Sequence, residues 1–140
     1  MKKLAILLGL IGLAVVLVAC GKKEGPSSGK VIKSAAAGNN LNVSLSTGDG
    51  VLKHGKPEFN LSFTDAAGKP VDVGAVGLTF RMPRMGTMAE MNNAATFTTT
   101  ETPGIYHGRA DIEVGGEWQV KITYEGPAGR GEASFPIVAH

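Results

Sequence analysis

The chain has 140 residues, with fourteen Lys and Arg against twelve Asp and Glu, and one cysteine. Two of the basic residues, Lys2 and Lys3, belong to an N-terminal export-type segment, so a chain cleaved after that segment carries equal numbers of basic and acidic residues. This balance gives no electrostatic basis for nucleic-acid binding, and a single cysteine excludes an internal disulfide.

Residues 1–19 predict a lipoprotein signal peptide. An uncharged apolar run follows the two lysines and is shorter than the ~20 residues of a membrane-spanning helix. The run ends in Leu-Val-Ala-Cys, which resembles the bacterial lipobox, so we expect Cys20 to become the lipidated, palmitate-bearing N-terminus. An uncleaved signal anchor is the alternative. The sequence therefore predicts a protein of the cell envelope, held to a membrane by lipid and facing the periplasm or the extracellular side.

Residues 20–40 are small, polar and basic, without apolar periodicity, and predict a flexible tether. From residue 41 to residue 140 the apolar residues alternate and turn residues punctuate the segments, as in strands with one buried face. We expect an all-β domain, an immunoglobulin-like antiparallel β-sandwich of about seven strands. The expected strands lie near 41–46, 58–63, 75–82, 106–114, 117–124 and 133–138, with weaker candidates at 51–53 and 95–101.

All methionines except the initiator lie in one window at three-residue spacing: Met82, Met85, Met88 and Met91. Met82 shares the parity of the apolar residues before it, which favours a core position at the end of a strand. Pro83 and Gly86 indicate that the segment after it is a loop.

Two local structures in this loop bring methionines together. A backbone of about three residues per turn places every third side chain on one side. The pattern Thr87-Met88-Ala89-Glu90 also fits a capping box and predicts one helical turn.

A cluster of thioethers is a soft ligand set that selects Cu(I), and thioethers remain usable in an oxidising compartment. Met85, Met88 and Met91, with Met82, are therefore the candidate metal ligands. His107 points away from the core by strand parity and is the candidate imidazole ligand, while His54 and His140 stay open. The sequence has no zinc or calcium motif, no nucleophile with a base and no phosphate-binding loop, which favours a protein that is not an enzyme.

The sequence contains three short motifs in order: Met82-Pro83-Arg84-Met85, Gly104-Ile105-Tyr106 and Gly116-Glu117-Trp118. Together they resemble the YtkA-like domain family, with some similarity to FixH-like proteins, and the resemblance covers residues 41–138. The resemblance implies an extracytoplasmic β-sandwich associated with copper or heavy-metal efflux and with cytochrome oxidase assembly. Met82 and Met85 match the family's methionine segment.

Two functions follow from these observations. The first is a lipid-anchored Cu(I) chaperone or buffer that passes copper to a copper-transport or oxidase-assembly protein in the membrane. The second is a module without metal, in which the methionine loop is an adaptable apolar contact for a protein partner of such a membrane complex.

Overall fold

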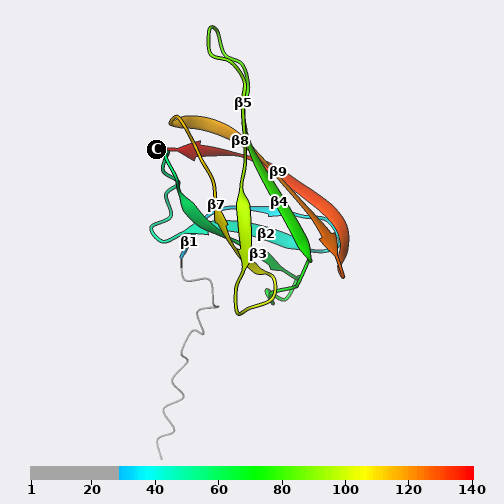
Figure 1. The fold of residues 1–140 in the computed structure, drawn as a ribbon. Helices are drawn as coiled ribbons and strands as arrows, with labels where there is room; N and C mark the ends of the chain where they lie inside the picture. Colours follow the sequence, from blue (N-terminus) through cyan, green and yellow to red (C-terminus); the bar gives the residue numbers. More distant parts are fainter. Residues whose placement is uncertain (1–28) are drawn as a thin grey trace, which may run out of the picture.

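The computed structural model describes residues 29–140, and in this part of the chain all regular structure is β (Figure 1). Nine strands form two antiparallel sheets, one of five strands in the order β1-β2-β3-β7-β6 and one of four in the order β5-β4-β8-β9. The strands are β1 Lys30–Ala36, β2 Asn42–Thr47, β3 Glu58–Thr64, β4 Ala75–Met82, β5 Met91–Ala94, β6 Thr96–Thr99, β7 Ile105–Arg109, β8 Gly116–Gly126 and β9 Gly129–Ala139. The predicted fold class is confirmed, with nine strands in place of about seven.

The core lies between the two sheets, because each long strand turns alternate side chains inward. Along β8 the buried residues are Trp118, Val120, Ile122 and Tyr124, and exposed residues stand between them. Phe59 of β3 meets Phe80 of β4 edge to face, with ring centroids 5.8 Å apart. This contact joins one sheet to the other. Trp118, the largest of these side chains, is 0% exposed.

The folded domain begins earlier than the expected boundary at residue 41. β1 pairs with β2 from Lys30 opposite Thr47 to Ala36 opposite Asn42. The predicted signal peptide, residues 1–19, and the first nine residues of the expected tether, residues 20–28, lie outside the described residues. The strand escaped prediction because it is a sheet edge with mostly exposed side chains, which leaves no alternating apolar pattern in its sequence.

Two other expected segments differ in extent. β7 ends at Arg109, and the chain beyond it makes only an isolated bridge, between Ile112 and Gly55. The weak candidate at 51–53 is likewise a single bridge, from Leu52 to Ala139. The candidate at 95–101 is β6. It follows β5 after one residue and pairs in the other sheet, so the chain changes sheets there.

Strand directions define two ends of the sandwich. At one end, which we call the hairpin end, β1, β5 and β8 begin and β2, β4 and β9 finish. At the other, the far end, lie the β8–β9 turn and the turn that follows β3. In Figure 1 the blue start of β1 and the C-terminus lie on one side of the molecule and the β8–β9 turn lies on the opposite side. No helix among residues 29–140 is long and apolar enough to cross a bilayer.

Candidate metal site in a methionine hairpin

The methionine window is the tip of a β-hairpin, residues 82–91, which we call the methionine hairpin. Met82, the last residue of β4, faces Met91, the first residue of β5. Met85 and Met88 form an isolated antiparallel bridge closer to the tip. Their backbones exchange hydrogen bonds, 2.9 Å from Met88 N to Met85 O and 3.3 Å in the other direction. In Figure 1 the connection from β4 to β5 projects well beyond both sheets.

A two-residue loop, Gly86-Thr87, closes the hairpin. Gly86 has φ +57°, and Thr87 is not among the residues with positive φ. Glycine at the first loop position is the signature of a type II′ turn, whose twist matches that of paired strands. The predicted helical turn over Thr87–Glu90 is therefore wrong, because Met88 pairs back to Met85. The predicted spiral of three residues per turn is wrong for the same reason.

The hairpin sorts the four methionines into two cross-strand pairs. Residues directly opposite each other on antiparallel strands have Cβ atoms about 4.5–5.5 Å apart and point to the same face. Met85 and Met88 are 66% and 48% exposed, whereas Met82 is 8% exposed and Met91 is partly buried against the core. The predicted core position of Met82 is confirmed. The exposed tip pair is thus the part of the window that an ion or a partner can reach.

Polar contacts hold the base of the hairpin. Arg81 Nε lies 2.9 Å from Glu90 Oε1, and the side-chain amide of Asn92 donates to the same oxygen at 3.0 Å. The hydrogen bond from Arg81, followed by that from Asn92, lowers the pKa of the Glu90 carboxyl. Glu90 is consequently ionised at neutral pH, and this contact is lost only as the pH falls through the lowered pKa.

Within residues 29–140, His107 makes no contact with the methionine hairpin. It lies on β7, in the other sheet, with its side chain 35% exposed and directed away from the core. Its Nδ1 lies 3.2 Å from Asn60 Oδ1 and its Nε2 lies 3.8 Å from Glu58 Oε2. The direction predicted from strand parity is confirmed, but these neighbours belong to the face of the five-stranded sheet.

The two histidines left open by the sequence are neighbours. His54 Nδ1 lies 2.9 Å from the backbone oxygen of His140, and the His54 backbone N–H donates to that same oxygen at 2.8 Å. A Cβ built on Gly115 would lie 4.0 Å from His54 Nδ1, and one on Gly116 would lie 3.4 Å from the Met82 methyl group. Both histidines therefore lie at the hairpin end, near Met82 at the base of the methionine hairpin and not at its exposed tip.

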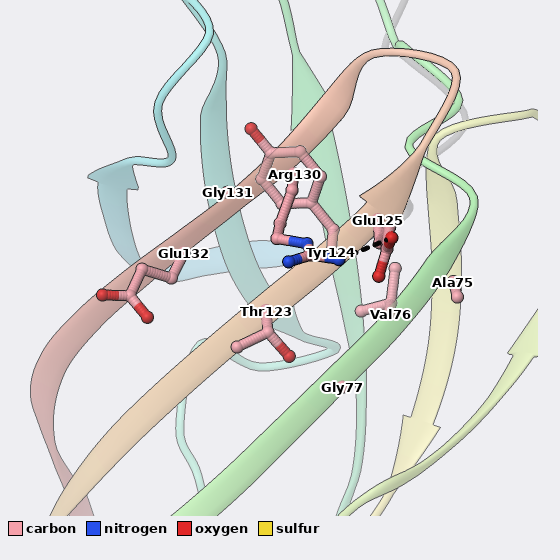
Figure 2. A pocket seen from close by; sticks show the side chains of 9 residues that line it. All are labelled: Ala75, Val76, Gly77, Thr123, Tyr124, Glu125, Arg130, Gly131 and Glu132. Atoms are coloured by element: carbon pink, nitrogen blue, oxygen red, sulfur yellow. Dashed lines mark hydrogen bonds and ion pairs between the residues drawn. The ribbon is translucent and has the colours of Figure 1, made fainter.

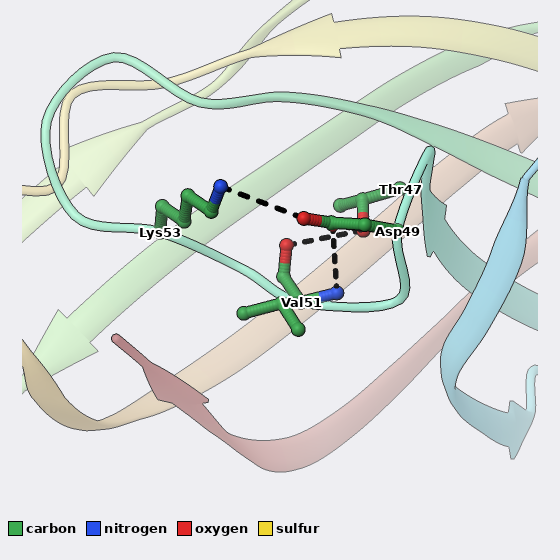
Figure 3. Close-up of polar contacts among 4 residues, drawn as sticks. All are labelled: Thr47, Asp49, Val51 and Lys53. Carbon is green, nitrogen blue, oxygen red and sulfur yellow. Dashed lines mark hydrogen bonds and ion pairs between the residues drawn. The ribbon is translucent and has the colours of Figure 1, made fainter.

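A compact turn before His54 fixes its position (Figure 3). Asp49 Oδ1 accepts hydrogen bonds from the Val51 backbone N–H at 3.1 Å and from the Thr47 hydroxyl at 3.3 Å. Lys53 Nζ lies 3.5 Å from the other carboxylate oxygen. The bond from Val51, helped by the charge of Lys53, lowers the pKa of Asp49. The Asp49 carboxylate is used within the turn and is a structural group.

A surface hollow of about 550 Å³ lies away from the methionines, on β4, β8 and β9 (Figure 2). Gly77 and Gly131 leave room there, and Arg130 spans its rim to Glu125 at 2.8 Å. Tyr124 turns its hydroxyl away, to donate to the Ala37 carbonyl at 2.7 Å. The hollow therefore presents an internally neutralised ion pair and no unpaired buried polar group for a ligand.

Sequence reasoning missed three features of the site: the cross-strand pairing of the methionines, the Arg81–Glu90 contact at the hairpin base, and the proximity of His54 to His140. The pairing of Met85 with Met88 had a local sequence signal, because the dipeptide Gly86-Thr87 between two strand segments fits a two-residue hairpin loop. The other two are contacts between distant segments and had none. Among residues 29–140, no three His, Cys, Asp or Glu side chains are grouped to hold a metal ion.

The sandwich and its projecting hairpin define a two-sheet all-β domain with a pair of exposed thioethers at one end. The model of the YtkA-like family matches residues 35–123, from within β1 to within β8. This is more than half of the chain, and the protein belongs to the YtkA-like family. Comparisons with curated proteins and with solved structures gave no match.

Proposed function

We propose that this protein is a lipid-anchored, extracytoplasmic copper-binding protein that carries or buffers Cu(I) and is not an enzyme. The observation that supports the proposal is the tip of the methionine hairpin. Met85 and Met88 are paired across the strands and exposed together, beyond the body of the sandwich. Two thioethers on one face suit a soft monovalent ion, and Cu(I) is the biological metal that such sulfur donors select.

An exposed tip also suits transfer of the ion. A chaperone must release what it binds, and ligands on a projecting hairpin are open to an incoming donor from a partner. Met91 lies opposite Met82, three residue positions below the tip pair, and is the candidate third ligand, while the buried Met82 supports the hairpin base. We propose a copper-transport or oxidase-assembly protein of the membrane as the receiver.

A Cu(I) competition titration against a chromophoric chelator tests the proposal. Leucine keeps most of the volume of methionine, and such exchanges cost less than ~1.5 kcal/mol even in a packed core. The variant Met85→Leu/Met88→Leu/Met91→Leu should stay folded and lose most of its Cu(I) affinity. Met82→Leu is the matched control, with affinity close to the parent. Unchanged affinity in the triple variant would reject the methionine site.

A metal-free interaction module is the second candidate, and the same exposed apolar tip favours it. Methionine side chains adapt to varied partner surfaces. Under this alternative the parent protein has little Cu(I) affinity from the start, and the triple leucine variant keeps partner binding because its apolar surface is retained. The titration therefore separates the two functions.

A further inference from the structure

Exposed apolar side chains gather at the hairpin end. The large hydrophobic residues that are exposed among residues 29–140 are Val31, Val51, Met85, Met88 and Val138. Val31 is the second residue of β1, Val138 is the last but one of β9, and Val51 lies in the turn beside them. Val51 and Val138 line one shallow hollow of about 370 Å³. The far end has no counterpart within the described residues.

Close contacts along the chain join these positions at one end of the molecule. Lys30 pairs with Thr47, and a Cβ on Gly50 would lie 3.0 Å from the Cβ of Lys30. Leu52, which follows the turn, bridges to Ala139. Ala139 in turn pairs with Gly116, which abuts Met82. The valines therefore lie around the point where the chain enters β1, and the methionine hairpin lies at the same end of the sandwich, at the opposite edge of the four-stranded sheet.

Few residues separate the proposed lipid-bearing Cys20 from β1. Cys20 precedes Gly29 by nine residues, whose fully extended reach is ~30 Å. The eleven residues of β9 run the length of the sandwich, ~36 Å at the rise of a strand. A lipid on Cys20 would hold the hairpin end near the bilayer. The segment from Cys20 to Gly29 is too short to let the far end rest on the bilayer instead.

We propose that the hairpin end is a membrane-contacting surface, in which Val31, Val51 and Val138 lie against the interface of the bilayer that carries the lipid and the methionine tip is directed into that interface. The inference rests on the proposed lipid anchor at Cys20. Each apolar contact is small, but the tether keeps the surface at high effective concentration near the lipid. An ion held by the tip is thereby presented in the plane where a membrane-embedded receiver opens.

Quenching by brominated lipid tests the orientation on the full, acylated protein in pure phospholipid vesicles. Lipidation consumes the Cys20 thiol, so an introduced cysteine is the only labelling site. A small fluorophore is placed at Thr87→Cys on the tip and, as the matched control, at Ala67→Cys in the exposed turn after β3 at the far end. We expect quenching at position 87 to be at least twofold stronger than at position 67. In protein that also carries Val31→Ser and Val138→Ser, the ratio of quenching at position 87 to that at position 67 should fall toward one.

Equal quenching at both positions, or stronger quenching at position 67, would overturn the proposal. Quenching at position 87 that requires membrane proteins in the vesicles would overturn it as well, since a protein partner would then cover this end. The quenching measurement needs no copper. If the Cu(I) titration shows no binding but the quenching at position 87 is retained, the proposed cargo is rejected and the proposed orientation is still supported. If mass spectrometry shows that Cys20 carries no acyl chains, both the proposed anchor and the proposed orientation are rejected.

Discussion

At the scale of single residues, the four methionines share one chemistry and differ in access. Thioether sulfur oxidises to the sulfoxide at a rate that follows exposure. We expect mild peroxide to oxidise Met85 and Met88 first, Met91 more slowly and Met82 last, in the order of their exposure. Peptide mass spectrometry over a time course measures this order. Early oxidation of Met82 would contradict the buried base of the hairpin.

Gly108 on β7 is a residue whose lack of a side chain is needed for packing. A Cβ there would lie 2.6 Å from Phe59 Cε2 and 2.7 Å from Phe97 Cε1, closer than carbon atoms approach. We expect Gly108→Ala to lower the free energy of unfolding by about 1–3 kcal/mol, as overpacking does. Gly48→Ala is the control, because nothing lies within 4 Å of its Cβ and its φ is not positive. Urea unfolding of both variants measures the difference, and equal midpoints would refute the packing argument.

At the scale of elements, β1 is the strand whose removal is most informative. A chain beginning at residue 41 lacks β1 and also Ala37, which is 0% exposed in the core. It further loses the Ala37 carbonyl that accepts from the buried Tyr124 hydroxyl, and an unsatisfied buried hydroxyl costs about 1–3 kcal/mol. We expect this chain to melt at a lower temperature than one beginning at residue 29, by circular dichroism.

A matched control tests whether the strand itself matters. A chain that begins at residue 29 and carries Val31→Ser and Lys33→Ser keeps the backbone pairing of β1 and changes only exposed side chains. Its melting temperature should stay close to that of the unsubstituted chain. If the chain from residue 41 melts at the same temperature as both, β1 adds nothing to stability.

How far the elements follow from sequence depends on burial. β8 and β4 were predictable because their alternate residues enter the core, and the alternation is visible in the sequence. β1 lies at an edge with mostly exposed side chains and carries no such signal. At the methionine hairpin two local patterns competed, a capping box at Thr87 and a two-residue turn at Gly86. Pairing between Met85 and Met88 decided the outcome, and that pairing depends on β4 and β5 being held in one sheet.

At the scale of the whole molecule, the proposed attachment to a membrane depends on Cys20. If Leu-Val-Ala-Cys is a lipobox, the protein extracted from membranes should begin at Cys20 with acyl chains attached and lack residues 1–19. Mass spectrometry of the intact protein and of its N-terminal peptide measures both features. The variant Cys20→Ser, which offers no thiol to acylate, should leave the membrane fraction or keep its signal peptide. A parent protein cleaved at another residue, without lipid, would contradict the anchor.

The order of the strands in the two sheets has a consequence for the speed of folding. β8 and β9 are joined by a two-residue turn and pair along their whole length, so they are able to form a hairpin from nearby residues alone. The contacts that complete each sheet join residues about fifty positions apart, Glu58 with Arg109 in one and Ala75 with Glu125 in the other. Sandwiches dominated by such distant pairings fold in milliseconds to seconds. A newly made chain should therefore spend that interval with β8 and β9 paired and β4 not yet placed beside β8. The methionine hairpin, whose own pairing is local, would join the body of the sandwich only when β4 pairs with β8.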